Sequence, residues 1–574
     1  MKKRVLYGAA NYEEIVEKNG YFVDKTAYIK ELETVDNPVF LRPRRFGKSL
    51  LCRILECYYN IRQKDDFQRL FGKTWIGKNP TPLHSSFLVL HLDFSVVEYR
   101  GSIEDIEKNF DLVCNSKIRT MIGMSNLWFP DNAQEFIITE KAAETFKRLI
   151  EYIEENKLPR LYLIIDEYDN FANQLIVLNK DGLYRKLIAD ESFIKIFFKT
   201  IKEGRKTGAI ANIFITGVLP ITMDELASGF NIANFITLYP QFENMLGFTQ
   251  SEVSLLLDEV YQDYEIEPST RKEVEQIMKN QYNGYHFVKQ DGEALYNPTI
   301  LLYFLQYFTH NREIPEILTD MNLKTDLLWI RRITGANPQN TEEFVTKLTT
   351  DNIIEYDRSL LTTKFNTFQF FEKGFYPVSF FYLGMLTIHD KFYLKLPNLN
   401  MRQIFVEYFN EIHNIDVSTK YAQMMQDFIN KPDISKLFSD YWQLYVSQLP
   451  EALFQKVNEN FYRTTFFELC SRYLSPWFTW NIERSYPKGR SDLEFVGKYS
   501  GKYAGIRIVI EFKYFSNSEL KKMNTTIKKF SLRKEDTAQI LKYVEGLKAE
   551  YPEAITSQFV IYCFGNQGFR VFEI

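Results

Sequence analysis

Short apolar runs alternate with amphipathic stretches in the first part of the chain. Four runs have the length and continuous hydrophobicity of strands buried on both faces, and they lie at residues 39–41, 87–92, 161–165 and 213–216. Between them, apolar residues recur with helical spacing, as at residues 103–118 and 142–153. This alternation predicts an α/β fold with a parallel sheet covered by helices on both faces.

The pattern changes after residue 248. Helical spacing predominates up to about residue 350. Two strand-like runs at residues 380–388 and 391–396 then precede a helical pattern at 401–412, an order that predicts a winged-helix-like unit. Further helical patterns cover residues 418–475.

Strand-like runs return in the last hundred residues and predict a second α/β fold. They lie at residues 492–496, 506–512 and 559–564. We therefore expect four parts: an α/β domain over 1–245, a helical region over 246–350, a winged-helix-like or helical connector over 351–450, and a C-terminal α/β domain over 451–574.

Composition and charge narrow the class of protein. The 574 residues carry a net charge of −4, so contact with nucleic acid would need a local basic surface. No run approaches the roughly 18 apolar residues that span a bilayer, and the N-terminus lacks the pattern of a signal peptide. The five cysteines have no zinc-like spacing with the six histidines. We expect a cytoplasmic protein with reduced cysteines and no membrane contact.

A basic loop joins the first apolar run to the first helical stretch. It reads Arg42-Pro43-Arg44-Arg45-Phe46-Gly47-Lys48-Ser49. A strand that enters a helix through Gly-Lys-Ser turns backbone N–H groups toward a phosphate. Lys48 is expected to reach the β- and γ-phosphates of a nucleotide and Ser49 to hold Mg²⁺. Arg42 stands where such a loop usually has its first glycine, and a basic helix N-terminus without a ligand is the alternative.

Two acids at the end of the third run support a nucleotide site. Asp166 and Glu167 follow this run directly. Phosphoryl transfer needs an acid near the metal and a base near the attacking water, so Asp166 is expected to serve Mg²⁺ and Glu167 the water. Taken alone, two acids are more often a solvated strand end. Thr216 ends the fourth run, where its side chain could sense the γ-phosphate.

Several motifs, in this order, resemble the predicted AAA-ATPase-like family of bacterial proteins over about residues 1–310. They are Phe22-Val23-Asp24-Lys25-Thr26, the arginine-rich loop, Ile165-Asp166-Glu167-Tyr168-Asp169, Phe214-Ile215-Thr216-Gly217-Val218, Asn283-Gly284-Tyr285 and Leu295-Tyr296-Asn297-Pro298. The resemblance implies a P-loop ATPase with a helical lid, ATP as the nucleotide, and a loop in which Arg44, Arg45, Phe46 and Gly47 contact it. AAA-like ATPases often act as rings, so we also consider a homo-oligomer, although no arginine finger stands out.

Two carboxylates and a lysine coincide in the C-terminal strands. Asp492 opens one strand, and Glu511 and Lys513 close the next. A hairpin symmetrical about Gly501 places Asp492 opposite Glu511, with Lys513 on the face of Glu511. Such acids can hold one or two Mg²⁺ ions, or Mn²⁺, and Lys513 can orient or deprotonate a water, because nearby cations and burial lower the pKa of a lysine. An exposed hairpin with an ordinary ion pair explains the same residues.

The pattern Asp492…Glu511-Phe512-Lys513 resembles the PD-(D/E)XK nuclease superfamily over residues 450–574. Gln539 and Tyr543 match the Gln-x-x-x-Tyr helix motif of its RecB-like members, with both side chains on one helical face. Glu459 is the candidate for the helix glutamate of this superfamily, and Glu468 is a second candidate. The resemblance implies nucleic acid as the substrate, with DNA favoured over RNA.

Two local features bear on this interpretation. Residues 512–536 carry seven basic residues against three acids, which can bind phosphates, although a solvated helix face explains them almost as well. Relatives have a histidine near the helix glutamate, and Arg463 stands there instead.

Three hypotheses for the function follow. The leading one is an ATP-binding and ATP-hydrolysing protein that regulates an attached Mg²⁺-dependent nuclease. The alternative is an ATP-dependent signalling switch whose C-terminal domain only binds nucleic acid or a protein partner. The third is an ATPase with an inert C-terminal domain.

Overall fold

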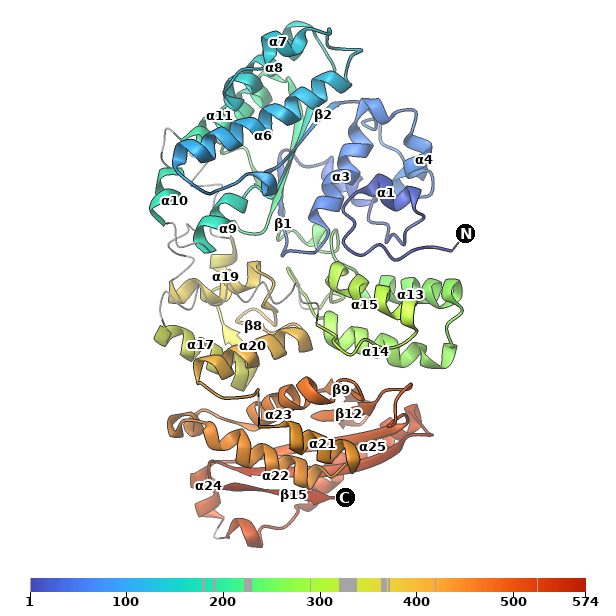
Figure 1. The fold of residues 1–574 in the computed structure, drawn as a ribbon, viewed down its shortest axis with the longest axis vertical. Helices are drawn as coiled ribbons and strands as arrows, with labels where there is room; N and C mark the ends of the chain where they lie inside the picture. Colours follow the sequence, from blue (N-terminus) through green and yellow to red (C-terminus); the bar gives the residue numbers. More distant parts are fainter. Residues whose placement is uncertain are drawn as a thin grey trace.

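The computed structural model places the chain in three tiers along its longest axis (Figure 1). It describes residues 2–177, 181–187, 189, 192–220, 230–289, 291–319, 338–362, 369, 372–418, 420–523 and 525–574. The helical pattern expected up to residue 350 includes residues 320–337, which lie outside these ranges. Within them, no helix has the length and hydrophobicity needed to cross a membrane.

Five parallel strands form the N-terminal sheet in the order β2-β3-β4-β1-β5. They are β1 (Pro38–Leu41), β2 (Leu88–Asp93), β3 (Leu161–Asp166), β4 (Ile210–Gly217) and β5 (Asn234–Phe235). Every residue of β1 and β3 is buried, which explains why both read as continuous apolar runs. The parallel sheet expected from the alternating pattern is therefore confirmed.

Helices cover both faces of this sheet (Figure 1). On one side, α3 (Lys48–Tyr59) packs on β2 and β3. On the other, α6 (Ile103–Met124), α8 (Ala142–Glu155) and α11 (Phe193–Thr207) form a layer. Shorter helices complete the tier: α1 (Tyr12–Glu17), α2 (Tyr28–Leu32), α4 (Phe67–Phe71), α5 (Trp75–Lys78), α7 (Ala133–Ile137), α9 (Asn170–Val177) and α10 (Asp181–Leu187).

The middle tier has two units. The lid consists of α13 (Gln250–Tyr264), α14 (Arg271–Tyr282) and α15 (Pro298–Asn311). The second unit runs through α17 (Pro338–Asp351), β6 (Ile353–Glu355), α18 (Ser359–Thr362), α19 (Tyr376–Tyr382), β7 (Thr387–Ile388), β8 (Tyr393–Lys395) and α20 (Leu399–Ile412). Its antiparallel sheet has the order β6-β8-β7, and this succession of elements agrees with the expected winged-helix-like arrangement.

One expected strand in this unit is wrong. The run that begins at Phe380 was expected to be a strand, but Phe380 to Tyr382 form the end of α19, and the strand begins only at Thr387. All seven residues of α19 are buried, so the run lacks the polar positions that would have shown helical spacing.

The C-terminal sheet has five strands in the order β15-β14-β13-β12-β9. They are β9 (Phe478–Ile482), β12 (Leu493–Gly497), β13 (Ile506–Phe515), β14 (Ile555–Phe564) and β15 (Gly568–Glu573), and a separate hairpin contains β10 (Ser485–Tyr486) and β11 (Gly489–Arg490). Only the β13–β14 pair in this sheet is parallel, and α25 (Lys534–Glu550) connects these two strands.

Helices again cover both faces of the sheet. One face packs against α23 (Glu459–Leu474), where Phe466 meets Phe512, and the other packs against α25. The short α24 (Asn517–Lys522) follows β13. Two helices from the expected connector, α21 (Ala422–Asn430) and α22 (Ile434–Leu444), also lie against the sheet through Phe428 and Phe438.

Candidate nucleotide and nuclease sites

The phosphate loop joins β1 to α3 at the carboxyl edge of the N-terminal sheet. Gly47 directly precedes α3 with a φ of 95°, a left-handed conformation that glycine adopts without strain. Lys48 begins the helix, so its backbone N–H is among the donors of the first turn that have no partner within the helix. The strand, loop and helix therefore have the arrangement of a phosphate-binding loop.

Lys48 lies between this loop and the acids that follow β3. Its Nζ donates to the Pro43 carbonyl at 3.2 Å and is 3.5 Å from the Glu167 carboxylate. The buried Asp166 carboxylate accepts from the Glu167 N–H at 2.9 Å and is hydrogen-bonded to Ser49. Burial and then the Glu167 charge raise the pKa of Asp166 to about 6. Ser49 and Asp166 fit Mg²⁺, because a cation there would offset the cost of ionising this acid.

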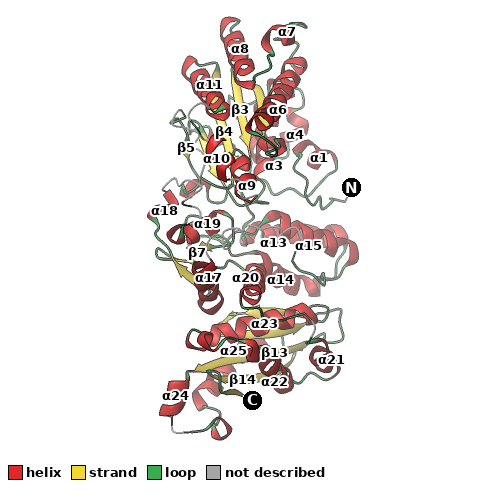
Figure 2. Ribbon diagram, turned by 60° about the vertical axis from the view of Figure 1, so that its left-hand side comes forward, coloured by secondary structure: helices red, strands yellow, loops and turns green. Residues whose placement is uncertain are grey.

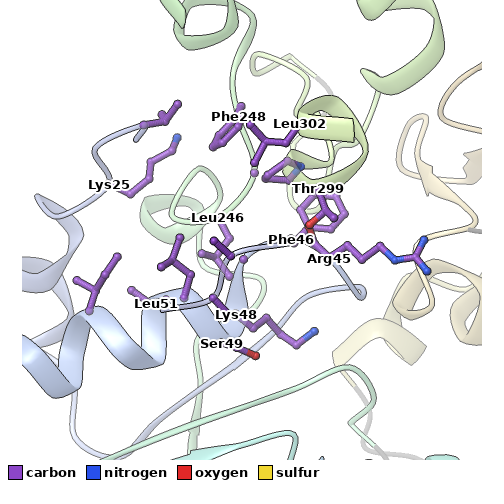
Figure 3. Close-up of a pocket in the computed structure, with 18 of the residues that line it drawn as sticks. Lys25, Arg45, Phe46, Lys48, Ser49, Leu51, Leu246, Phe248, Thr299 and Leu302 are labelled. Carbon is purple, nitrogen blue, oxygen red and sulfur yellow. The ribbon is translucent and has the colours of Figure 1, made fainter. Parts of the chain in front are cut away.

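A cavity of about 470 Å³ opens beside the loop. Figure 3 shows Lys48 and Ser49 at one end of the cavity and Phe248 and Leu302 toward the other. Phosphate-loop donors at one end and apolar side chains at the other match the two halves of a nucleotide. The apolar end could not be identified from the sequence, because its side chains come from segments far apart in the chain, among them Phe22, Phe248 and Leu302.

Arg42 lies in the core rather than beside the cavity. Its guanidinium donates to the carbonyls of Thr237 at 3.1 Å and Glu243 at 3.1 Å, and it lies 4.3 Å from the ring of Phe40 and 4.4 Å from that of Phe287. Burial lowers its pKa to about 9. The residue at the position of the usual first glycine thus joins the loop to neighbouring segments.

Thr216 also has a partner inside the sheet. Its hydroxyl donates to the Phe40 carbonyl of β1 at 2.8 Å, and the side chain is buried. Contact with a γ-phosphate would therefore require this hydrogen bond to break.

The lid holds the backbone of the phosphate loop. Asn297 donates to the Arg44 carbonyl at 3.3 Å, and the Thr299 hydroxyl donates to the Arg45 carbonyl at 3.0 Å. The Phe46 ring packs edge-on against Tyr285 with 5.2 Å between ring centroids. The lid thus contacts backbone carbonyls of this segment directly, and Figure 3 shows the Arg45 side chain extending away from Lys48.

Asp492 and Glu511 meet in the C-terminal sheet. The antiparallel register pairs Leu493 with Ile510 and so brings Asp492 opposite Glu511, as the symmetrical hairpin predicts. The Phe512 N–H donates to Asp492 Oδ2 at 2.9 Å. Both acids are buried, with exposed fractions of 6% for Asp492 and 1% for Glu511.

Three side chains donate to the Glu511 carboxylate. Lys513 lies 2.7 Å and Gln539 2.6 Å from Oε1, and the Tyr543 hydroxyl lies 2.5 Å from Oε2. Gln539 and Tyr543 stand one turn apart on α25, which explains their spacing. Burial lowers the pKa of Lys513, but the charge and hydrogen bond of Glu511 and the charges of Glu459 and Asp492 together outweigh burial and raise this pKa. The expected lowering of this pKa is therefore wrong, and Lys513 is a cation suited to orienting a water rather than deprotonating it.

Glu459, rather than Glu468, lies with these residues. Burial, followed by the charges of Asp492 and Glu511, raises the pKa of Glu459 to about 7. Glu468 stands further along α23 and pairs with Arg472. The repulsion among the three acids calls for a counter-charge, which a hard divalent cation with oxygen ligands would supply once the acids draw closer to one another.

Arg463 and Glu483 complete the surroundings of Asp492, and no sequence motif identifies their roles. Arg463 Nη1 is 2.8 Å from Asp492 Oδ1, and Nη2 is 3.1 Å from Glu483. Glu483 follows β9 with a left-handed φ of 54°, and its N–H donates to the Asp492 carbonyl. Burial opposes its ionisation, but Arg402 and Arg463 lower its pKa to about 2.

A further group lies behind the nucleotide site. Ligand atoms of Cys52, His91 and Asp166 lie within 4.8 Å of one another, although the spacing of cysteines and histidines predicts no such contact. His91 Nδ1 is 2.8 Å from the Glu56 carboxylate. Because Asp166 is also hydrogen-bonded to Ser49, this group adjoins the nucleotide site.

Comparisons with known proteins agree with the two-part architecture. Residues 6–227 match the family model described as predicted AAA-ATPase, and residues 457–573 match the PD-(D/E)XK nuclease superfamily. The first match contains the phosphate loop and its acids, and the second contains Glu459, Asp492, Glu511, Lys513, Gln539 and Tyr543. The architecture inferred from the sequence is confirmed by these matches.

Other comparisons add little. No curated protein matches the sequence. Among solved structures, the Walker-type ATPase PABY2304 of Pyrococcus abyssi is similar, with 14% identity, a TM-score of 0.38, and coverage of 67% of this chain and 94% of that one. We draw no conclusion from similarity at that level.

Proposed function

We propose that this chain, which joins a predicted AAA-ATPase region to a PD-(D/E)XK nuclease superfamily region, hydrolyses ATP and uses its nucleotide state to regulate cleavage of nucleic acid. The observation that carries the proposal is the convergence of Asp492, Glu511 and Lys513 of the C-terminal sheet with Glu459 at the start of α23. Well-packed apolar residues would stabilise the fold at least as well as three acids and a cation, so these charged residues indicate a role in function.

At the nucleotide site, each side chain has a role that follows from its position. Lys48 exchanges its contact with Glu167 for the β- and γ-phosphates of ATP. Glu167 then orients the attacking water. Ser49 and Asp166 would hold Mg²⁺, which neutralises phosphate charge when bound.

At the nuclease site, Glu459, Asp492 and Glu511 would hold a divalent cation, Mg²⁺ or Mn²⁺, which activates water and stabilises the leaving oxygen when bound. Lys513 orients the water or the scissile phosphate through its charge. Gln539 and Tyr543 fix both oxygens of Glu511. The substrate class we favour is DNA.

One observation favours the signalling switch as a second candidate. Both oxygens of Asp492 already have partners, Arg463 and the Phe512 N–H. In that function the C-terminal domain binds nucleic acid or a protein partner without cleaving.

The test is cleavage of single- and double-stranded DNA and RNA with Mg²⁺ or Mn²⁺, with and without ATP. We expect cleavage to fall at least about 100-fold in Lys513→Ala. The effect of ATP on cleavage should disappear in Lys48→Ala. Lys542→Ala, an exposed lysine on α25, is the matched control and should behave as wild type. Cleavage that survives Lys513→Ala would contradict the assigned site, and no cleavage by wild type would favour the switch.

A further inference from the structure

The helix α20 contacts the phosphate loop through one side. Met401 and Ile404 line a small hollow together with Pro43 and Phe46 of the loop. Gly384, in the segment that leads to β7, approaches the loop so closely that a Cβ on it would lie 2.5 Å from the Pro43 Cβ. A shift of the loop on nucleotide binding therefore cannot leave this unit of the middle tier undisturbed.

The same helix contacts the C-terminal tier through neighbouring residues. Arg402 Nη2 is 2.8 Å from the Glu483 carboxylate, and Gln403 donates to the Ser471 hydroxyl at 2.8 Å. Figure 2 shows α20 beside α23, the helix that carries Ser471 and Arg463. One turn of α20 thus contacts the surroundings of both sites.

A continuous row of charges leads from this turn to the nuclease site. Arg402 is paired with Glu483 at 2.8 Å, Glu483 with Arg463 at 3.1 Å, and Arg463 with Asp492 at 2.8 Å. Arg463 is almost completely buried, with 5% of its side chain exposed. Charge pairs withdrawn from water interact more strongly than surface pairs, so each member of the row affects the next.

We propose that Arg463 is a positioning residue that competes with the divalent cation for Asp492, and that α20 sets this competition according to the nucleotide in the phosphate loop. This inference rests on the proposed function. Arg463 neutralises Asp492 and occupies Oδ1, so the cation must displace it. Glu483 is shared between Arg402 and Arg463, and the exposed Arg490 lies further away, at 3.5 Å. When Arg402 withdraws, Glu483 attracts Arg463 more strongly, and Asp492 is released for the cation.

Two substitutions in the row should have opposite effects. Arg402→Ala removes the nearest cation from Glu483 and leaves it to Arg463 and the more distant, exposed Arg490, so Mn²⁺ should bind the nuclease site about tenfold more tightly. Glu483→Gln leaves the charge of Arg463 to Asp492, with Asn460 as a neutral hydrogen-bond partner, so Mn²⁺ should bind about tenfold more weakly. Arg402→Lys keeps the charge and should fall between wild type and Arg402→Ala. A purely structural role of these residues would weaken binding in all three variants.

Mn²⁺ binding to the full-length protein is measured by electron paramagnetic resonance of the free ion. Each titration is repeated in an Asp492→Asn background, and the difference between the two titrations gives the Mn²⁺ bound at the nuclease site. A non-hydrolysable ATP analogue should tighten binding in wild type and have no further effect in Arg402→Ala. Glu407→Gln is the control, because Glu407 also joins α20 to α23, 3.7 Å from Arg472, away from Asp492.

The inference would be overturned if Arg402→Ala and Glu483→Gln changed the Mn²⁺ affinity in the same direction. It would also be overturned if the ATP analogue did not change the Mn²⁺ affinity of the wild type. These outcomes are separable from failure of the proposed function. ATP-dependent cleavage with unshifted Mn²⁺ affinities would overturn the inference and leave the function standing. Opposite shifts in Mn²⁺ affinity without any cleavage would support the role of the charge row and contradict the proposed nuclease function.

Discussion

The guanidinium of Arg42 lies 4.4 Å from the ring of Phe287, so the first position of the phosphate loop is joined to the lid region rather than to a phosphate. Its donors satisfy carbonyls of Thr237 and Glu243 in the segment that follows β5. An arginine at a position usually occupied by glycine thus holds together segments that are far apart in the sequence.

Arg42→Ala should destabilise the protein strongly. It leaves buried carbonyls without donors and opens a cavity between two rings, at a cost of about 3 kcal/mol or more. The midpoint of thermal unfolding should fall by at least about 6 °C. Differential scanning calorimetry measures this, with the exposed Arg44→Ala as the control. An Arg42→Gly variant that bound ATP better without losing stability would contradict the structural role.

Local patterns in the sequence predict much of the fold and part of each site. The strands β1 and β3 are buried along their whole length, so their apolar runs are visible without alignment, and the acids of β3 follow directly. The pairing of Asp492 with Glu511 follows from the symmetry of one hairpin. These features depend on residues close in sequence or on one turn.

The remaining features depend on tertiary contacts that no spacing rule describes. The apolar end of the nucleotide cavity combines segments far apart in the chain, such as Phe248 before α13 and Leu302 in α15. Glu483 reaches Arg463 only because the chain after β9 turns back to pair with Asp492. Lys513 was expected to lose its charge on burial, but Glu511, Glu459 and Asp492 together outweigh burial once the fold brings them around the amine.

Binding of Mg²⁺–ATP should weaken below about pH 6. The pKa of Asp166 is raised to about 6, so the free protein holds a proton there that the cation must displace. The apparent affinity should fall by up to about tenfold per pH unit below that value and level off above it. Titration of a fluorescent ATP analogue between pH 5 and 8 measures this. Asp166→Asn corrects for protonation of the nucleotide itself, and an identical pH profile in that variant would contradict the assignment.

Glu459→Gln should stabilise the protein at alkaline pH. The folded protein holds the Glu459 proton up to about pH 7, whereas the unfolded chain loses it near pH 4. Ionising this group therefore costs folding stability as the pH rises from about 4 to 7, and the stability is greatest below that window. We expect the variant to have a free energy of unfolding about 1–3 kcal/mol above wild type at pH 8, and equal to it near pH 4. Denaturant unfolding at both pH values measures the difference. A variant that is destabilised equally at both pH values would contradict the raised pKa of Glu459.

Glu167→Gln should separate ATP binding from hydrolysis. The carboxylate pairs with Lys48 at 3.5 Å, so its neutralisation frees the lysine for phosphate and should leave nucleotide affinity equal or higher. Loss of the group that orients water should slow hydrolysis at least about 100-fold. Equilibrium binding and phosphate release measure the two effects, with the exposed Glu154→Gln on α8 as the control. If the hydrolysis rate of Glu167→Gln is unchanged, a residue other than Glu167 orients the attacking water.

The order of the tiers along the chain has a consequence for biosynthesis. The sheet of the nuclease-like domain places β13, which carries Glu511 and Lys513, between β12 and β14, so the strand is not enclosed until the residues after α25 have been made. Domains generally fold in order as they leave the ribosome. The phosphate loop and α20 both precede Glu459, so they leave the ribosome before the strands of the proposed nuclease site are paired. A nascent chain would therefore acquire the proposed nucleotide site before the proposed nuclease site is assembled.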